Sequence, residues 1–482
     1  GQREDRGAAG GAGHDGLLVG VSTPAGRRRE EPYGGPGKAQ VKPAAGDPPG
    51  WPWARLTRAA GRHTVPAMEE TLAEIDVATP DAYADGIPHA TFARLRRDDP
   101  VHWHPWEWTG GGFWAVTRHA DVQRISRDWQ TWSSAVGHIY LWEPSPEALE
   151  ARRSMIETDP PKHTRLRRIV SSAFTPRKVR EYEEISRRVA RGLLDALPGP
   201  GGEIDLVAAV CKPMPISILV SILGVPDEDT GYLVELTDHL VEGTSGEPLD
   251  PSAYGNTTPL ELLPFGSPAA HALFEYGRRM AVERRREPAD DLVSRLVLAE
   301  VDGDRLTDAE LVNFFQLLAF AGNETTRTAM AQGLRAFMEH PEEWQRIVDD
   351  RSLLPRAVEE VLRWSTPIIS FRRTALVDTT IGDVQVAAGD KAVMFYVSAN
   401  FDEDVYEDPL RFDVGREAPE SVTFGGGGPH FCLGAWLARL EIRVLFEELL
   451  DRGLRFEEAG APQRVRSNFV HGLETLPARV AG

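Results

Sequence analysis

Apolar and polar residues alternate at helical spacing over most of the chain from about residue 80 onward. Apolar positions recurring every three to four residues indicate amphipathic helices. This pattern predicts helices over 88–99, 119–128, 164–175, 181–197, the apolar run around Cys211, and 355–365. Alternating or β-branched runs predict a strand at 113–117 and a strand–turn–strand unit within 378–399.

The longest predicted helix covers residues 307–340. Thr307 and Glu310 have the S/T-x-x-E spacing of a capping box, in which each residue's side chain bonds the other's backbone N–H. The middle of this segment is apolar nearly all round, which predicts a helix that runs through the core. Together these elements predict a mainly α fold with a small segregated β region.

The first 67 residues differ from the rest of the chain. Residues 1–67 are rich in Gly, Pro, Ala and Arg and show no sustained periodicity, so we expect a disordered N-terminal extension. The folded part is expected to begin near Met68 and to form a single domain over 68–482. Within it, 243–268 is dense in Gly, Pro, Ser and Thr, which predicts a long flexible connection of the kind that often acts as a lid.

Composition narrows the class of protein. The net charge of -19 argues against general nucleic-acid binding. The sequence contains no run of about 18 apolar residues, so no membrane span is expected. The two cysteines exclude a disulfide framework and are typical of a reducing cytoplasm, which is the expected location.

Cys432 is the residue with the strongest chemical signal. It follows four glycines, Pro429 and His430, and it precedes a long helix-forming run. Unpaired N–H groups and the helix dipole at such a position favour a thiolate, which is a good ligand for a soft or borderline metal. No second cysteine lies nearby, so a single thiolate on a haem iron fits better than a zinc knuckle. The alternative is a small buried hydrophobic residue, which is the expected role of Cys211.

The long central helix carries an unusual polar segment, AGNETT, at 321–326. Gly322 inside a helix suggests a need for space or a local distortion. Glu324 and Thr325 place an acid and an alcohol side by side, as proton delivery to a bound group would require. The alternative is a solvated groove, or a Thr325 hydroxyl that bonds the carbonyl oxygen four residues earlier.

Three further groups are ambiguous when taken alone. Glu360 and Arg363 share a helix face, as do His163 and Arg167, and Arg373 lies near a predicted strand. Two donors on one face suit an anion such as a carboxylate. Each group is equally compatible with a solvated charged surface.

The order of these motifs is far more specific than any one of them. The chain contains D-P-P-x-H-T-x-x-R at 159–167, A-G-x-E-T-T at 321–326, E-x-x-R at 360–363 and H-x-C-x-G at 430–434. From about residue 70 to the C-terminus it resembles the cytochrome P-450 family of haem-thiolate monooxygenases. The glycine run and the segment RSNFVHGLETLPAR look most like soluble actinobacterial members that hydroxylate sterol side chains and methyl-branched lipids.

The resemblance implies a role for each motif. It implies that Cys432 is the axial thiolate of haem b and that Gly322, Glu324 and Thr325 line the dioxygen groove. It also implies that four residues hold the haem propionates, namely His163, Arg167, Arg373 and His430. It implies that Glu360 and Arg363 form a buried structural network with Arg411. The family's commoner pattern has Phe seven residues before the cysteine, whereas here Gly425 takes that place and Phe424 precedes it.

The implied reaction inserts one oxygen atom of dioxygen into a C–H bond of a bulky hydrophobic substrate, with a sterol, terpenoid or branched lipid favoured. Electrons would come from NAD(P)H through ferredoxin reductase and a ferredoxin, and the protein is expected to be a monomer. A docking patch for the ferredoxin is predicted at Arg165, Arg168, Arg177 and Lys178.

Four segments are expected to contact the substrate: 133–145, 243–268, the helix around Phe320, and PIISF at 367–371. The open alternatives are a tailoring hydroxylase or epoxidase of a polyketide or peptide-derived metabolite, a peroxygenase or isomerase, and a non-catalytic haem-binding partner or sensor.

Overall fold

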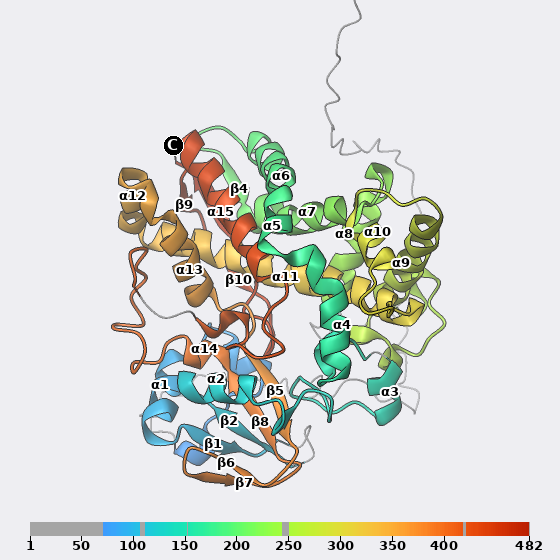
Figure 1. Ribbon diagram of the computed structural model, residues 1–482. Coiled ribbons are helices and arrows are strands. Elements are labelled where there is room, and N and C mark those ends of the chain that lie inside the picture. The colour runs from blue at the N-terminus through green and yellow to red at the C-terminus, as the bar shows by residue number, and fades with distance from the viewer. Residues whose placement is uncertain (1–70, 107–110, 152, 243–249, 418–420, 482) are drawn as a thin grey trace, which may run out of the picture. The chain divides into compact units, whose positions relative to one another are not determined.

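One helix organises the structure. The structure is a computed structural model that describes residues 71–106, 111–151, 153–242, 250–417 and 421–481. Within it, helix α11 (Asp308–Glu339) crosses the middle of the helical region (Figure 1). The predicted capping box is confirmed, because Thr307 Oγ1 accepts the Glu310 N–H at 3.2 Å and Glu310 Oε2 accepts the Thr307 N–H at 2.9 Å.

Helices make up most of the described chain, and those predicted from periodicity are present. The helices before α11 are α1 (His89–Asp98), α2 (His119–Arg127), α3 (Pro146–Ala151), α4 (Lys162–Ser171), α5 (Pro176–Glu181), α6 (Glu183–Asp195), α7 (Pro213–Leu223), α8 (Asp227–Glu242), α9 (Pro268–Arg286) and α10 (Leu292–Leu298). Those after it are α12 (Pro341–Asp349), α13 (Leu354–Ser365), α14 (Tyr396–Ala399) and α15 (Ala435–Arg452). Helix α11 packs against α7, α9, α13 and α15, which explains why it is apolar nearly all round.

A five-stranded sheet lies to one side of the helices, with α1 and α2 beside it (Figure 1). Its order is β1 (Val101–His104), β2 (Phe113–Val116), β8 (Lys391–Phe395), β5 (Ser370–Ala375) and β3 (Trp132–Ser133). The β2–β8 pair is parallel and the others are antiparallel. Along β8, Val393 and Phe395 join one apolar cluster while Ala392 and Met394 join another, as the two-residue period of a strand buried on both faces requires.

The remaining strands form small sheets. Strands β4 (Glu203–Asp205), β12 (Pro477–Val480) and β9 (Phe456–Glu458) make one of three, β10 (Gln463–Arg464) pairs with β11 (Leu473–Thr475), and β6 (Thr379–Ile381) pairs with β7 (Val384–Val386). The predicted mainly α fold with a small segregated β region is therefore confirmed. No helix among the described residues combines the length and apolar character needed to cross a membrane.

The expectation of a disordered extension at 1–67 lies outside the described residues. The expected flexible connection at 243–268 is described from residue 250 onward, where it is a connection built of short turns, and its flexibility stays a prediction. Short 3-10 turns occupy Ala253–Gly255, Leu260–Leu262 and Pro264–Gly266, and α9 already begins at Pro268. Pro259, Pro264 and Pro268 restrict the backbone that the glycines and serines suggested would be free.

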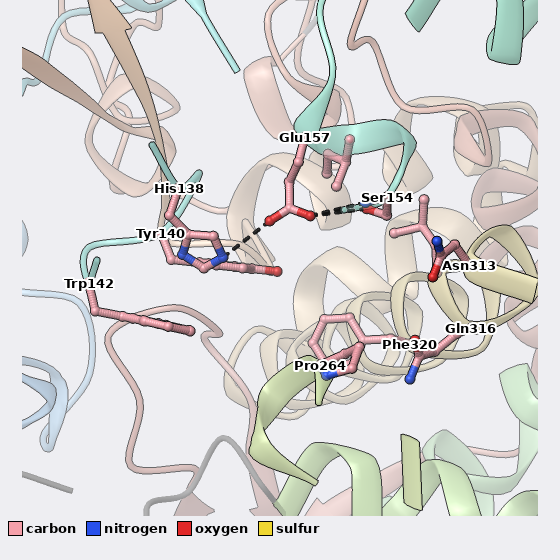
Figure 2. A pocket seen from close by; sticks show the side chains of 11 residues that line it. His138, Tyr140, Trp142, Ser154, Glu157, Pro264, Asn313, Gln316 and Phe320 are labelled. Carbon is pink, nitrogen blue, oxygen red and sulfur yellow. Dashed lines mark hydrogen bonds and ion pairs between the residues drawn. The ribbon is translucent and has the colours of Figure 1, made fainter. Parts of the chain in front are cut away.

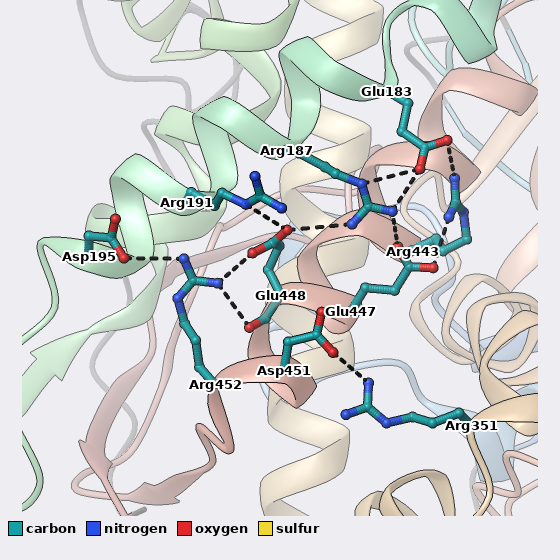
Figure 3. A network of polar contacts seen from close by, with 10 residues as sticks. All are labelled: Glu183, Arg187, Arg191, Asp195, Arg351, Arg443, Glu447, Glu448, Asp451 and Arg452. Carbon is teal, nitrogen blue, oxygen red and sulfur yellow. Dashed lines mark hydrogen bonds and ion pairs between the residues drawn. The ribbon is translucent and has the colours of Figure 1, made fainter.

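A network of ion pairs joins α6 to α15 (Figure 3). Glu448 on α15 lies at its centre, with only 3 % of its side chain exposed, and it accepts from Arg187 and Arg191 of α6 and from Arg452 of α15. Arg443 bridges Glu183 of α6 and Glu447 of α15 at 2.9 and 2.8 Å. These contacts hold α15, whose first turn follows Cys432, against the helical core.

Candidate haem-thiolate site

The loop before α15 is shaped by four consecutive glycines. Gly425 to Gly428 have φ values of +100°, +67°, +103° and +76°, a region that residues with a side chain rarely adopt. At Gly428 a Cβ atom would overlap the backbone oxygen of Ser126 and lie 2.9 Å from Arg127 Cα. The chain then turns back, so that the Cys432 N–H donates to the Phe424 carbonyl oxygen at 3.0 Å.

Cys432 lies directly before the N-terminus of α15. Helix α15 has Gly434 as its N-cap and no side-chain cap, so its first N–H groups remain available. The Cys432 side chain is accessible, whereas desolvation by the surrounding protein raises the pKa of its thiol. A thiol that faces a hollow inside the protein has both properties. The N–H groups of Gly434 and Ala435 and the guanidinium of Arg167 oppose that rise, because each stabilises a thiolate.

Four basic residues gather close to Cys432. The rings of His163 and His430 have centroids 4.2 Å apart, and Arg167 Nη1 donates to the Pro429 carbonyl oxygen at 3.1 Å. Burial, together with Arg167, lowers the pKa of His163 to about 4. Burial, together with Arg373, His163 and Arg167, lowers the pKa of His430 to about 2. The structure thus brings together all four residues predicted to hold an anionic ligand.

This cluster fits the carboxylates of a haem. The buried atoms His163 Nδ1 and His430 Nε2 have no hydrogen-bond partner among the described residues. The neighbouring carboxylate of Asp159 is already bound by Ser133 Oγ and the Ser134 N–H. Two buried, unpartnered ring nitrogens beside two arginines and a single thiol are the donor set that two propionates and one axial ligand require.

The predicted residues of α11 have different surroundings. Thr325 donates its hydroxyl to the Ala321 carbonyl oxygen at 2.8 Å, which is the backbone contact that the alternative interpretation expected. Ala321 is exposed although most of α11 is buried, so this turn borders open space. A Cβ at Gly322 would meet only Leu219, at an ordinary 3.7 Å. The surrounding protein therefore gives no support to the expectation that Gly322 is needed for space.

Glu324 points away from that open space. Its side chain is 1 % exposed, and its Oε1 accepts from Arg327 Nη2 at 2.6 Å. A Cβ built at Gly472 would lie 3.2 Å from this oxygen, which places the carboxylate against the C-terminal segment. Burial raises the pKa of Glu324, and the nearby charge of Arg327 opposes that rise. Glu324 and Thr325 are adjacent in sequence but face different environments.

The predicted Glu360–Arg363 pair is buried, with each side chain 2 % exposed, and it is bidentate at 2.7 and 2.8 Å. The prediction for its third member is wrong. Arg411 is exposed, and it takes part in the network through its carbonyl oxygen. Arg416 supplies the side chain instead, because its Nε donates to both Glu360 oxygens at 3.2 and 3.3 Å. Arg416 Nη2 also donates to the Arg411 carbonyl oxygen at 2.6 Å. The chain bends between the two arginines, and only Arg416 returns toward α13.

Phe424, which lies eight residues before Cys432 rather than seven as in the commoner family pattern, is buried. Its ring centroid lies 6.2 Å from that of Phe431, and the Arg439 guanidinium carbon is 4.5 Å from its centroid. Its carbonyl oxygen also accepts the Cys432 N–H. The extra residue is therefore absorbed in the glycine run, and Phe424 keeps a place next to the cysteine loop.

A pocket lies along one face of α11 (Figure 2). The His138–Glu157 pair, 3.2 Å apart, lies across it from Gln316 and Phe320. The pocket is lined by His138, Tyr140, Trp142, Ser154, Ile156, Glu157, Pro264, Asn313, Gln316, Leu317 and Phe320. Three of the four segments expected to contact substrate contribute to this lining, whereas 367–371 does not.

Sequence reasoning missed several residues of this region. Gln316 is the most visible omission, because an amide inside the apolar run FFQLLAF is a detectable signal. Ser154 and Glu157 have no such signal, since they reach the pocket only through the tertiary fold.

Comparisons with known proteins agree with this geometry. The model of the Cytochrome P450 family matches residues 133–469. The chain is 37% identical over 425 residues to a Steroid C26-monooxygenase of Rhodococcus jostii (strain RHA1), covering 86% of each chain. It is also 37% identical over 433 residues to a Methyl-branched lipid omega-hydroxylase of Mycobacterium bovis, covering 86% of this chain and 96% of the relative.

A solved structure is similar over the same range. A Mycobacterium marinum cytochrome P450 in complex with pseudoionone superposes with a TM-score of 0.74 at 40% identity, covering 86% of this chain and all of that one. The fold, the cysteine loop and these similarities define a haem-thiolate protein. The chain belongs to the cytochrome P450 family, and it is a monooxygenase.

Proposed function

We propose that this monooxygenase hydroxylates the terminal part of a steroid side chain or of a methyl-branched lipid. The aromatic pocket along α11 is the observation that carries this proposal, because the rings of Tyr140, Trp142 and Phe320 line it and favour a hydrophobic ligand. The relatives named for steroid and methyl-branched lipid oxidation support the same substrate class.

In this proposal the Cys432 thiolate would hold the iron of the haem. Four residues would bind its two propionates, namely His163, Arg167, Arg373 and His430. When bound, the haem supplies dioxygen activation and the transfer of one oxygen atom, and the thiolate's electron donation favours O–O cleavage. Two carboxylates placed in the cluster would stabilise the buried charges of Arg167 and Arg373 and would raise the lowered pKa values of His163 and His430.

Thr325 and Glu324 have separate tasks in proton delivery. The Thr325 hydroxyl borders the open space and holds a proton position there, while the Ala321 carbonyl orients it. Glu324 is held by Arg327, so it exchanges protons with this space only after its side chain leaves that ion pair. We therefore place Thr325 at the reacting groups and Glu324 behind it as a gated proton source.

Electrons arrive from NAD(P)H through ferredoxin reductase and a ferredoxin in this proposal. The patch expected from the sequence is not a net cationic surface. Arg165 pairs with Asp304 and Glu310, Arg168 pairs with Asp302, and Lys178 pairs with Glu181.

We place the ferredoxin instead over the cysteine loop. The arginines there are also paired, Arg439 with Glu359 and Arg356 with Glu417, but they outnumber the glutamates among the lining residues. A surface pocket there is lined by four arginines against two glutamates, and also by Phe431 and the half-exposed Trp436, both close in sequence to Cys432. Its charged residues are Arg356, Arg363, Arg416, Arg439, Glu359 and Glu360. The double charge reversal R356E/R439E is expected to slow haem reduction and weaken its salt dependence, whereas R165E/R168E leaves both unchanged.

The substrate test uses a panel of steroids, methyl-branched lipids, a polyketide and a cyclic peptide, each scored first by the low-spin to high-spin shift of the haem. Binding compounds are then incubated with ferredoxin, reductase, NAD(P)H and ¹⁸O₂. One ¹⁸O atom at the end of a steroid side chain or branched chain is expected.

The other results of this test would contradict the proposal in different ways. Labelled product from the polyketide or peptide alone would replace the substrate class. Turnover with peroxide but not with ferredoxin would indicate a peroxygenase, and binding without any turnover would indicate a sensor. A monomeric state and a cytoplasmic location remain part of the proposal.

A further inference from the structure

One buried polar group in the pocket lacks a protein partner. The side chain of Gln316 is 4 % exposed and projects from α11 into the pocket (Figure 2). Its amide nitrogen Nε2 has no hydrogen-bond partner among the described residues. Buried amides are nearly always hydrogen-bonded, and one that is not is costly, so an unpartnered amide in a ligand pocket points to the ligand.

Two other polar side chains of the pocket, Glu157 and Asn313, are already engaged by the protein. The Glu157 carboxylate is bound by His138 Nε2 at 3.2 Å and by the Ser154 N–H at 3.2 Å. Asn313, one turn before Gln316 on the same helix face, donates its Nδ2 to the Arg153 carbonyl oxygen at 3.4 Å. The Gln316 amide nitrogen, by contrast, has no acceptor among the described residues and is available to a bound molecule.

Gln316 and Thr325 project from opposite sides of α11. They are nine residues apart, which is about two and a half turns at about 3.6 residues per turn. The pocket follows the Gln316 side of the helix, where Leu317 and Phe320 also line it. A molecule bound there meets the Gln316 amide beside apolar side chains.

We propose that Gln316 is a positioning residue whose amide N–H binds one carbonyl or hydroxyl oxygen of the substrate. This hydrogen bond fixes the orientation of the substrate in the pocket, and thereby the carbon that is oxidised. The substrate class is a bulky hydrophobic molecule with one oxygen function. This inference rests on the proposed function, and it narrows the steroid and branched-lipid class to its oxygenated members.

The test compares matched ligands that differ by one oxygen. Cholesterol and cholest-5-ene form one pair, and phytanol and phytane form the other. Dissociation constants from the spin-state shift are measured for the wild type, for Gln316→Met, which keeps length but removes the donor, and for Leu317→Met. The Leu317 variant is the control because it changes an apolar neighbour in the same pocket by a similar small amount.

The wild type is expected to bind the oxygenated member of at least one pair more tightly. Gln316→Met should weaken that member by roughly fivefold, as the loss of one net hydrogen bond predicts, and leave its hydrocarbon partner unchanged. Leu317→Met should not alter the preference. Where product forms, Gln316→Met should spread oxidation over several neighbouring carbons while the total haem content stays the same.

Two results would overturn the inference. One is a wild type that does not distinguish the members of either pair, and the other is a Gln316→Met variant that retains the full preference. Both leave the proposed function standing if labelled product still appears. Conversely, a preference that disappears in Gln316→Met supports the inference even when neither pair gives product, a result that would count against the proposed function alone.

Discussion

At Thr325 the hydroxyl is held by the helix that carries it, through the bond to Ala321. That bond fixes the Thr325 hydroxyl oxygen at the border of the open space. It also provides this polar group with a hydrogen-bond partner inside an otherwise apolar helix. Replacing Thr325 by Ala removes the proton position but little volume. We expect substrate binding to stay within a factor of about two, while product per NAD(P)H falls roughly tenfold and peroxide is released instead.

The matched control for this prediction is Thr325→Ser, which retains the hydroxyl. Peroxide formation and product yield are measured together, so that uncoupling is distinguished from slow reduction. Normal coupling in Thr325→Ala would assign the proton path to other groups.

Gly428 and Gly453 both have positive φ, +76° and +66°, but different neighbours. A Cβ at Gly428 overlaps the Ser126 backbone, whereas a Cβ at Gly453 meets nothing within 4 Å. Gly453→Ala should lower the free energy of unfolding by about 1 kcal/mol, the backbone cost alone. Gly428→Ala should cost about 2 kcal/mol or more and reduce haem content, because the cysteine loop must shift.

Urea unfolding of the two variants, together with haem-to-protein absorbance ratios, checks this difference. Equal destabilisation, with full haem content in both, would mean that the loop accommodates the methyl group.

At the scale of the element, the buried pair on α13 depends on Arg416. Arg416→Ala leaves Glu360 with one cation and should lower the free energy of unfolding by about 2 to 3 kcal/mol, since a partly unpaired buried charge is costly. Arg411→Ala should change it by less than about 0.5 kcal/mol, because only the backbone carbonyl of that residue takes part. Chemical denaturation of both variants decides which arginine completes the network, and the reverse order of effects would restore Arg411.

Two of the three glutamates of helix α15 have pKa shifts of opposite sign. Burial raises the pKa of Glu448, but Arg452 and Arg191 outweigh it and hold the pKa below its ordinary 4.5. Its contribution to stability is therefore present above pH 4.5 and is lost as the pH falls below that value. Burial without a compensating charge raises the pKa of Glu441 well above 4.5, so its cost grows as the pH rises through 4.5.

These opposite signs give a paired prediction. Glu448→Gln should be less stable than the wild type at pH 7, and the difference should shrink at pH 4. Glu441→Gln should be more stable than the wild type at pH 7, with that gain also shrinking at pH 4. Thermal melts at both pH values measure the four differences, and the same sign for both variants at pH 7 would contradict the assignment.

Elements with local signals were the predictable ones. The capping box placed the start of α11 correctly because both of its bonds join neighbouring residues, and the glycine run marked the cysteine loop for the same reason. Arg416 and Glu157 reach their partners only through bends and packing between distant segments, which no local pattern encodes.

At the scale of the whole molecule, the described chain separates two tasks. The α6–α15 network holds the helix that follows the cysteine loop, while the residues of α11 and of the 138–157 region line a pocket. Motif order identified the first task from sequence alone. Substrate binding depends on which side chains meet across the pocket. The substrate therefore does not follow from the motifs, and its identification needs the structure and an experiment.

The central claim is that Cys432 is the thiolate ligand of a haem. The most direct test is the carbon monoxide difference spectrum of the reduced protein, recorded for the wild type, for Cys432→Ser, and for Cys211→Ser as the control at the buried cysteine. We predict a strongly red-shifted Soret band in the wild type and in Cys211→Ser, and its absence in Cys432→Ser. A red-shifted band that persists in Cys432→Ser would contradict the account.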